Sequence, residues 1–214
     1  MSDELFREVD EEVRQDRFQQ LWKRYSAIGL AVVVLIVGAT VAFVVWRDSQ
    51  LAAKEADGSR FLAAVMQEKT QRDEAITALR EIARDGTAGY RFLASLREAA
   101  LLAEAGDVAE AVAIFDALAT DDAFAGPYRD VARISAVARG MESMSVEEVE
   151  ERLFNLNVAT NPFRATAREF LAVSAIRAGN EARADELLRA NLDDRETPAS
   201  VRVRANELLA LIGN

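Results

Sequence analysis

The pattern of apolar and polar positions separates residues 26–46 from the rest of the chain. These 21 consecutive positions contain no Asp, Glu, Lys, Arg, Asn, Gln or Pro. At about 1.5 Å of rise per residue they form a helix of roughly 32 Å, close to the ~30 Å hydrocarbon thickness of a bilayer. Lys23 and Arg24 precede the run and Trp46 closes it, which is typical of side chains at the headgroup level. The pattern therefore predicts a transmembrane helix over residues 26–46.

Two other interpretations fit this run less well. A buried helix of a soluble protein rarely extends over this length without one polar face. A cleaved signal peptide has a short basic start and an apolar stretch of about 7 to 15 residues. Here 25 residues precede the run, and seven of them are acidic. We therefore expect the span to remain uncleaved.

The polar segment before the span, residues 1–25, has a helical pattern of its own. Phe6, Val9 and Val13 fall on one stripe of a helix. The stripe predicts a short amphipathic helix on the side of the membrane that holds the N-terminus. A helix that docks on a partner and a polar lead-in without a partner both fit this pattern.

The basic residues near the two ends of the span favour one orientation. Four Lys or Arg side chains lie within about 15 residues before the span, and three lie within the same distance after it. Because cytoplasmic segments carry the excess of Lys and Arg, this difference predicts a cytoplasmic tail. The domain after the span is then exported.

The segment after the span follows a helical pattern that is broken at intervals. Good helix formers dominate it, and the whole chain contains only 10 Gly and 3 Pro. Breaks such as Gly106-Asp107 and Gly179-Asn180 separate successive helices, which come in pairs. No strand-like alternation appears outside the span, so the predicted fold class is all-α. The predicted helices cover residues 51–68, 73–84, 90–105, 108–119, 128–139, 146–155, 162–178, 181–190 and 198–212.

Three of these helix pairs share one spacing of marker residues. A small residue is followed after seven positions by a turn residue, after five more by Ala and after four more by a large apolar residue. The small residues let the two helices of a hairpin approach closely, and the large one fills the layer toward the next hairpin. The stretch 128–155 has two helices without the markers. The markers are Ala63, Thr70, Ala75 and Leu79, then Ala99, Gly106, Ala111 and Phe115, and finally Ala172, Gly179, Ala184 and Leu188.

This spacing resembles the tetratricopeptide repeat without its signature Trp and Tyr. It predicts a TPR-like α-hairpin repeat (solenoid) domain over residues 47–214. The layout of the chain also resembles the YfgM-like family of bacterial inner-membrane proteins, whose best-known member is an ancillary subunit of the SecYEG translocon. The features that carry this resemblance are a tail that opens DELFREVDEEVRQ and ends LWKRY, one span and a divergent repeat domain.

The resemblance implies a location and a set of partners. It implies a single-pass protein of the cell inner membrane with a cytoplasmic N-terminus and a periplasmic repeat domain. The implied partners are the SecYEG translocon, a membrane-anchored periplasmic chaperone and exported client proteins. The implied function is in protein translocation, where exported proteins pass to periplasmic chaperones. The alternative is a TPR scaffold of another envelope complex, for division or outer-membrane biogenesis.

Composition narrows the chemistry that the chain can carry out. It has no Cys and no His, which leaves no zinc site of the usual ligands, no Ser-His-Asp triad and no disulfide. A formal charge of -10, shared by tail and domain, disfavours nucleic acid as a partner. No phosphate-binding glycine loop is present, and acidic pairs such as Asp121-Asp122 and Asp193-Asp194 fit a solvated surface. We expect a protein-interaction module that is not an enzyme, with no cofactor, no metal and no small-molecule substrate.

Two sets of residues are candidates for contact with partners. In repeat arrays the first helix of each hairpin lines a concave groove, and the register places a mostly apolar set there. Packing of the same residues against neighbouring helices fits equally well. In the span, a stripe of mainly small residues suits close helix packing, although a plain anchor has such residues too. The groove set is Arg60, Ala64, Gln67, Leu96, Ala100, Ala103, Glu169, Val173 and Ile176, and the stripe is Ala27, Ala31, Leu35, Gly38 and Ala42.

Overall fold

The protein is helical throughout the part that the structure describes. The computed structural model describes the backbone of residues 2–213 and the side chains of Trp22, Arg24 and residues 28–213. Over this range it contains helices and no strand, so the all-α prediction is confirmed. The helices are α1 (Ser2–Gln67), α2 (Arg72–Asp85), α3 (Ala88–Ala105), α4 (Val108–Thr120), α5 (Gly126–Gly140), α6 (Val146–Leu153), the 3-10 turn η1 (Phe154–Leu156), α7 (Arg164–Arg177), α8 (Glu181–Asp193) and α9 (Ala199–Ile212).

Backbone contacts divide the chain into two compact units, Met1–Glu55 and Ala56–Asn214. The first unit belongs to α1, which is helical through both the predicted tail and the predicted span. The side chains of Phe6, Val9 and Val13 lie outside the described residues. The helical backbone of the tail agrees with its pattern, and its amphipathic face stays a prediction.

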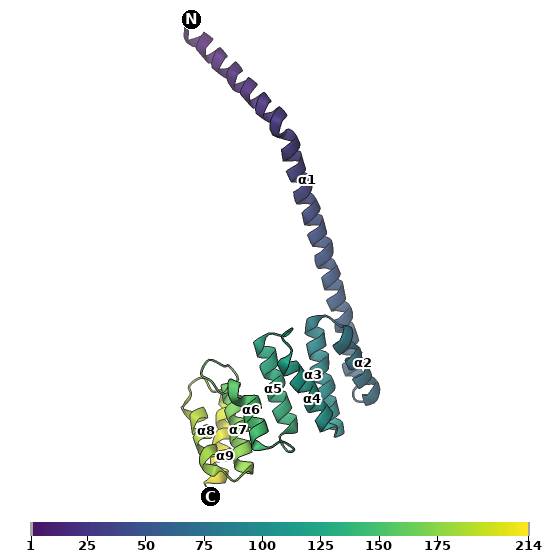
Figure 1. Ribbon diagram of the computed structural model, residues 1–214, viewed down its shortest axis with the longest axis vertical. Coiled ribbons are helices and arrows are strands. Elements are labelled where there is room, and N and C mark those ends of the chain that lie inside the picture. Colours follow the sequence, from purple (N-terminus) through teal and green to yellow (C-terminus); the bar gives the residue numbers. More distant parts are fainter. Residues whose placement is uncertain (1, 214) are drawn as a thin grey trace. The chain divides into compact units, whose positions relative to one another are not determined.

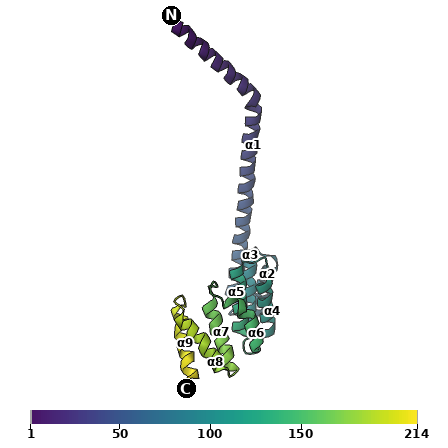
Figure 2. The same ribbon diagram turned by 60° about the vertical axis from the view of Figure 1, so that its left-hand side comes forward.

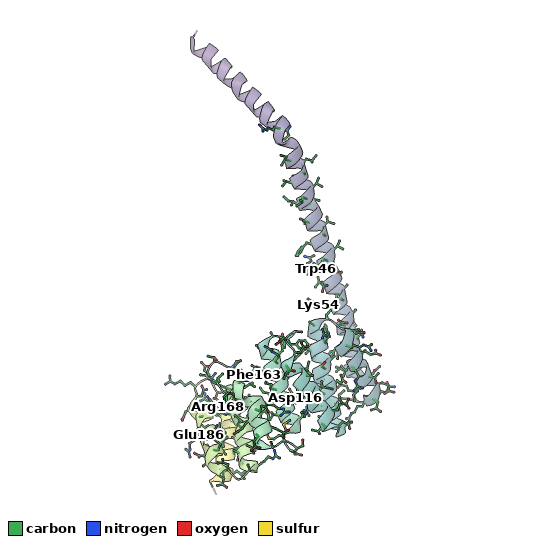
Figure 3. All side chains as sticks on the ribbon, in the orientation of Figure 1. Trp46, Lys54, Asp116, Phe163, Arg168 and Glu186 are labelled. Carbon is green, nitrogen blue, oxygen red and sulfur yellow. The ribbon has the colours of Figure 1, made fainter. Side chains whose placement is uncertain are left out.

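The apolar part of α1 has the properties of a membrane span. Residues 28–56 are all exposed (Figure 3). The region Ile28–Gln67 is long and apolar enough to cross a membrane, with a mean hydropathy of 2.9 in its most apolar part. These properties are compatible with a single-pass anchor, and a signal sequence near an N-terminus has them too.

The second unit is a row of helical hairpins. Residues 56–67 of α1 begin the first hairpin and α2 completes it, and the pairs α3–α4, α5–α6 and α7–α8 follow in order (Figures 1 and 2). Each helix from α2 to α9 packs against the next one along the chain, and α9 packs on both α7 and α8. The row is held by buried apolar clusters, of which the largest joins α5–α6 to α7, α8 and α9.

The marker residues occupy the packing positions that their spacing predicts in two hairpins. Ala99, Ala111, Ala172 and Ala184 are fully buried. Gly106 and Gly179 adopt positive φ angles of 100° and 74°, a conformation that favours glycine. Gly106 is the C-cap residue of α3, and Gly179 follows the C-cap residue of α7, Ala178. Both glycines therefore close the hairpin turns as predicted.

The first hairpin departs from the spacing by one residue. Ala64 is buried at 1% exposure, and Ala63, the predicted marker, is exposed. The turn residue Thr70 is β-branched, and no residue other than glycine has a positive φ in the described chain. Without a left-handed residue the helix ends through a different turn, which leaves one residue fewer between Ala64 and the buried Ala75.

The hairpin that lacks the markers is present as α5 and α6. Ala136, Val149 and Leu153 are fully buried in it at the positions that the markers hold elsewhere. Val149 replaces the usual Ala, and the connection is one residue longer. Gly140, the last residue of α5, allows α4 to approach closely. A Cβ at this position would lie 2.6 Å from Val112 Cγ2 and 2.7 Å from Met144 Cε.

Candidate interaction surface

The first helices of the hairpins form one layer of the array. We call residues 56–67 together with α3, α5, α7 and α9 the inner layer, since helices at these positions line the concave side of repeat arrays. Within it, α3 contacts α5, α5 contacts α7, and α7 contacts α9. Any groove residue predicted from the sequence must lie on this layer.

The nine predicted groove residues lie on the inner layer with different exposures. Arg60 and Gln67 are exposed, Ala64 is buried, and the remaining six are half-buried. Ala64 belongs to the core of the first two hairpins, and Leu96 and Ala103 pack against that core. Val173 and Ile176 pack against the core of the last hairpins. Apolar members of the set thus contribute to helix packing, and contact with a partner stays a prediction.

Arginine side chains bridge successive helices of the inner layer. Arg97 of α3 pairs with Glu68, Arg139 of α5 lies 3.9 Å from a carboxylate oxygen of Glu104, and Arg204 of α9 pairs with Glu169. Arg177 of α7 donates to the carbonyl oxygens of Met141 and Glu142.

These bridges bring charged pairs to the inner layer, for which the sequence predicts a mostly apolar groove. The groove itself stays a prediction. The partners are 29 to 35 residues apart, about one repeat. A search for opposite charges at the repeat spacing would have indicated them.

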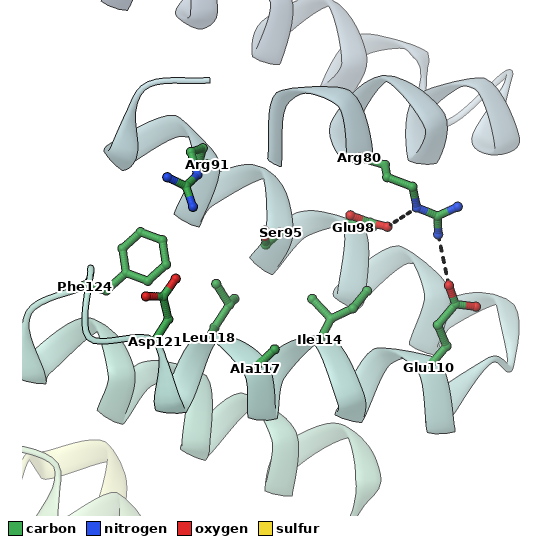
Figure 4. A pocket seen from close by; sticks show the side chains of 10 residues that line it. All are labelled: Arg80, Arg91, Ser95, Glu98, Glu110, Ile114, Ala117, Leu118, Asp121 and Phe124. Atoms are coloured by element: carbon green, nitrogen blue, oxygen red, sulfur yellow. Dashed lines mark hydrogen bonds and ion pairs between the residues drawn. The ribbon is translucent and has the colours of Figure 1, made fainter. Parts of the chain in front are cut away.

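A separate cavity of about 370 Å³ lies among α2, α3 and α4. At one end Arg80 donates to Glu98 at 2.7 Å and to Glu110 at 3.0 Å (Figure 4). Glu98 is only 5% exposed, and burial raises the pKa of its carboxyl group, an effect that Arg80 opposes. A second hollow, of about 550 Å³, lies beside the Arg97–Glu68 pair.

The other end of the 370 Å³ cavity holds two charged groups that do not pair with each other. Arg91 has a buried Nε atom without a hydrogen-bond partner. Among the described residues, the carboxylate of Asp121 accepts a hydrogen bond only from the N–H of Ala123, at 2.8 Å. Ser95, Ile114, Ala117, Leu118 and Phe124 complete the lining (Figure 4). This cavity was not expected from the sequence, which assigned Asp121 to a solvated surface.

The comparison with protein families agrees with this architecture. Residues 19–136 match the tetratricopeptide repeat-like domain family, which is more than half of the chain. The chain therefore belongs to this family. The match starts before the apolar segment and extends through the first two hairpins into α5. No curated protein and no solved structure matches the chain.

Family membership defines the class of protein. Tetratricopeptide repeat-like domains are protein-interaction modules and are generally non-enzymatic scaffolds. Among the described residues no group of three or more Asp or Glu side chains is placed to hold a metal ion. The surfaces described above are therefore candidates for binding other proteins.

Proposed function

We propose that the protein is a membrane-tethered interaction module of the bacterial inner membrane. In this proposal residues 1–25 are a cytoplasmic tail, residues 26–46 span the membrane, and residues 47–214 form the periplasmic repeat domain. One observation carries the proposal: a single chain joins an apolar helix of membrane-spanning length to a repeat array of the interaction class. A family match that covers both parts supports a shared role for them.

The partners in this proposal are the SecYEG translocon and a membrane-anchored periplasmic chaperone. The module then helps exported proteins pass from the channel to periplasmic chaperones. The support is the resemblance of the tail, span and repeat layout to the YfgM-like family. The inner layer is the proposed surface for the chaperone or for exported clients.

The span is proposed to contribute a packing face as well as an anchor. Ala31, Leu35, Gly38 and Ala42 are exposed in the described chain, whereas the side chain of Ala27 lies outside it. A Cβ added to Gly38 would meet no atom within 4 Å, so that the face is open to another helix. Small residues allow two helix backbones to approach closely in lipid.

Purification from mild detergent, followed by mass spectrometry, tests the assignment of partners. The expected result is co-purification of the channel subunits and the chaperone. Enrichment of division proteins or outer-membrane assembly factors in their place would favour the alternative scaffold. A periplasm-active reporter fused after Asn214 tests the orientation, because it is active only if the repeat domain is exported.

A further inference from the structure

The second and fourth hairpins are copies that can be compared residue by residue. Helices α4 and α8 are each 13 residues long, and their C-cap residues are Asp121 and Asp194. These two residues have nearly equal backbone angles, φ −75° and ψ 112° for Asp121 and φ −77° and ψ 113° for Asp194. Each carboxylate accepts a hydrogen bond from the N–H two residues further on. The ends of the two helices are therefore equivalent.

In the fourth hairpin two guanidinium groups share this carboxylate. Arg164 donates to Asp194 through Nε at 2.6 Å and through Nη2 at 3.0 Å. Arg168 donates to the same carboxylate from Nη1 at 3.1 Å. The two arginine side chains are 12% and 17% exposed, so they fill the space between α7 and the end of α8.

In the second hairpin one of these arginines is missing. Arg91 precedes Asp121 by the same 30 residues that separate Arg164 from Asp194. Ser95 stands at the position of Arg168. Arg91, Ser95 and Asp121 all line the 370 Å³ cavity (Figure 4). The cavity therefore occupies the place that a guanidinium group fills in the fourth hairpin.

The other replacements make this place more acidic. Glu98 and Glu110 stand where the fourth hairpin has Leu171 and Arg183. Three carboxylates, from Glu98, Glu110 and Asp121, thus line the cavity against two guanidinium groups. Arg80 is already shared by Glu98 and Glu110, so Asp121 and Arg91 are the charged lining groups without an ion-pair partner among the described side chains. The lining still carries one more carboxylate than guanidinium groups. This charge balance favours a cation in the cavity.

The shape of the cavity suits the rest of an arginine side chain. Leu118 and Phe124 lie next to Asp121, and Ile114 continues the apolar lining along α4 toward Glu110 (Figure 4). An arginine can lay its aliphatic stem along such a lining and present a planar group with several donors to a carboxylate. A lysine has the stem but only a compact ammonium group.

We propose that this cavity binds an arginine side chain of a partner protein, whose guanidinium group donates to Asp121 as Arg168 donates to Asp194. The inference rests on the proposed function as an interaction module and names the chemistry of the segment that it recognises. That segment is basic and carries apolar neighbours beside the arginine. Its charge complements a chain with a formal charge of -10.

A pair of peptides tests the proposal on the full chain in mild detergent. One fluorescein-labelled peptide contains Gly-Leu-Arg-Leu-Gly, and the other has citrulline, a neutral group of the same shape, in place of arginine. Fluorescence anisotropy should give an affinity at least about tenfold higher for the arginine peptide, since it alone makes a charge-assisted hydrogen bond. Equal affinities would overturn the proposal.

Substitutions in the cavity should raise or lower the affinity for the arginine peptide according to the charge that they change. Ser95→Arg supplies the missing guanidinium from the chain itself and should abolish binding, whereas Ala113→Arg adds the same charge at an exposed position outside the cavity and should not. Asp121→Asn should weaken binding about tenfold, and Asp122→Asn, whose side chain is 92% exposed, is the matched control. Arg91→Gln should tighten binding, because it removes a neighbouring cation.

An anionic ligand would give the opposite pattern. A peptide with Glu in place of Arg would then bind, Arg91→Gln would weaken binding and Asp121→Asn would strengthen it, and this result would overturn the proposal. Co-purification reports separately on the proposed function. If the channel co-purifies but the two peptides bind equally, the cavity proposal fails and the tethered module stands. If the channel does not co-purify but the arginine peptide binds more tightly than the citrulline peptide, the channel assignment fails and the arginine site stands.

Discussion

The carboxylate of Asp57 accepts a hydrogen bond from the backbone N–H of Thr87, over a distance of 2.6 Å. Asp57 is 6% exposed and belongs to the first hairpin, while Thr87 is the N-cap residue of α3. The side chain of Thr87 makes no capping hydrogen bond, and the first turn of α3 contains no acidic residue. A side chain from the preceding hairpin therefore caps this helix, and it links the folding of the first two repeats.

Replacing Asp57 by Asn should destabilise the domain. Asparagine keeps an acceptor oxygen but loses the charge, so we expect a loss of about 1 to 2 kcal/mol in the free energy of unfolding at pH 7. Urea unfolding followed by circular dichroism measures it. Asp107→Asn is the control, because Asp107 is exposed and makes no capping hydrogen bond with its side chain.

The same variant should change the response to acid. The Thr87 N–H holds the pKa of the Asp57 carboxyl group below its ordinary value of 3.8, although burial acts in the opposite direction. The stabilisation is therefore complete above that value and is lost as the pH falls through the lowered pKa. Asp57→Asn should lose less stability than the wild type over this acidic range. If the free energy of unfolding of the two proteins falls equally with decreasing pH, Asp57 is not the group that titrates.

Replacing Gly140 by Ala should loosen the contact between α4 and the end of α5. The new methyl group would lie 2.6 Å from Cγ2 of Val112, a stiff β-branched side chain, so we expect a loss of about 1 to 3 kcal/mol. Gly89→Ala is the matched change in a helix, and its methyl group meets no atom within 4 Å. That variant should be neutral or more stable by up to about 1 kcal/mol. Equal melting temperatures for both variants would contradict the close approach.

Two phenylalanines should differ sharply when each is truncated to alanine. Phe115 is 2% exposed in the core of the first two hairpins, and its loss should cost about 3 to 5 kcal/mol. Phe154 is 75% exposed in η1, and its loss should change stability by less than about 0.5 kcal/mol. Chemical unfolding of the two variants distinguishes the residues, and similar losses would show that η1 is packed in solution.

Enlarging Gly38 to leucine tests the proposed packing face of the span. The added side chain should block close approach of a partner helix and reduce co-purification, while insertion into the membrane is retained. Val37→Leu changes a neighbouring face and should leave partner recovery intact. If both variants recover partners equally, the span serves as an anchor alone.

The sequence predicts the hairpins well where one local rule decides the structure. Glycine at positions 106 and 179 permits the left-handed turn, and the alanines on either side permit the close crossing, so spacing alone finds these two copies. The first copy is off by one residue because Thr70 needs another kind of turn. The third copy is missed because Val149 replaces the alanine and the connection is longer.

The candidate surface is harder to predict because it depends on residues from different repeats. Arg139 and Glu104 meet only after α3 and α5 have been packed side by side. The cavity exists because Ser95 is too small to fill the space that Arg168 fills two copies later. Neither feature leaves a pattern within a single helix. The apolar span has such a pattern, and it is the part that the sequence predicts most directly.

The difference between Ser95 and Arg168 has a consequence for how such a protein diversifies. In an array of similar hairpins, each position of the repeat occurs several times within one chain. Each hairpin is stabilised mainly by contacts with its immediate neighbours. One substitution in one hairpin can then remove a stabilising ion pair without unfolding the other hairpins. A position whose side chain supports the fold in one copy can border an open cavity in another copy. An array of this kind can therefore acquire a new binding specificity at a position that had only a packing role.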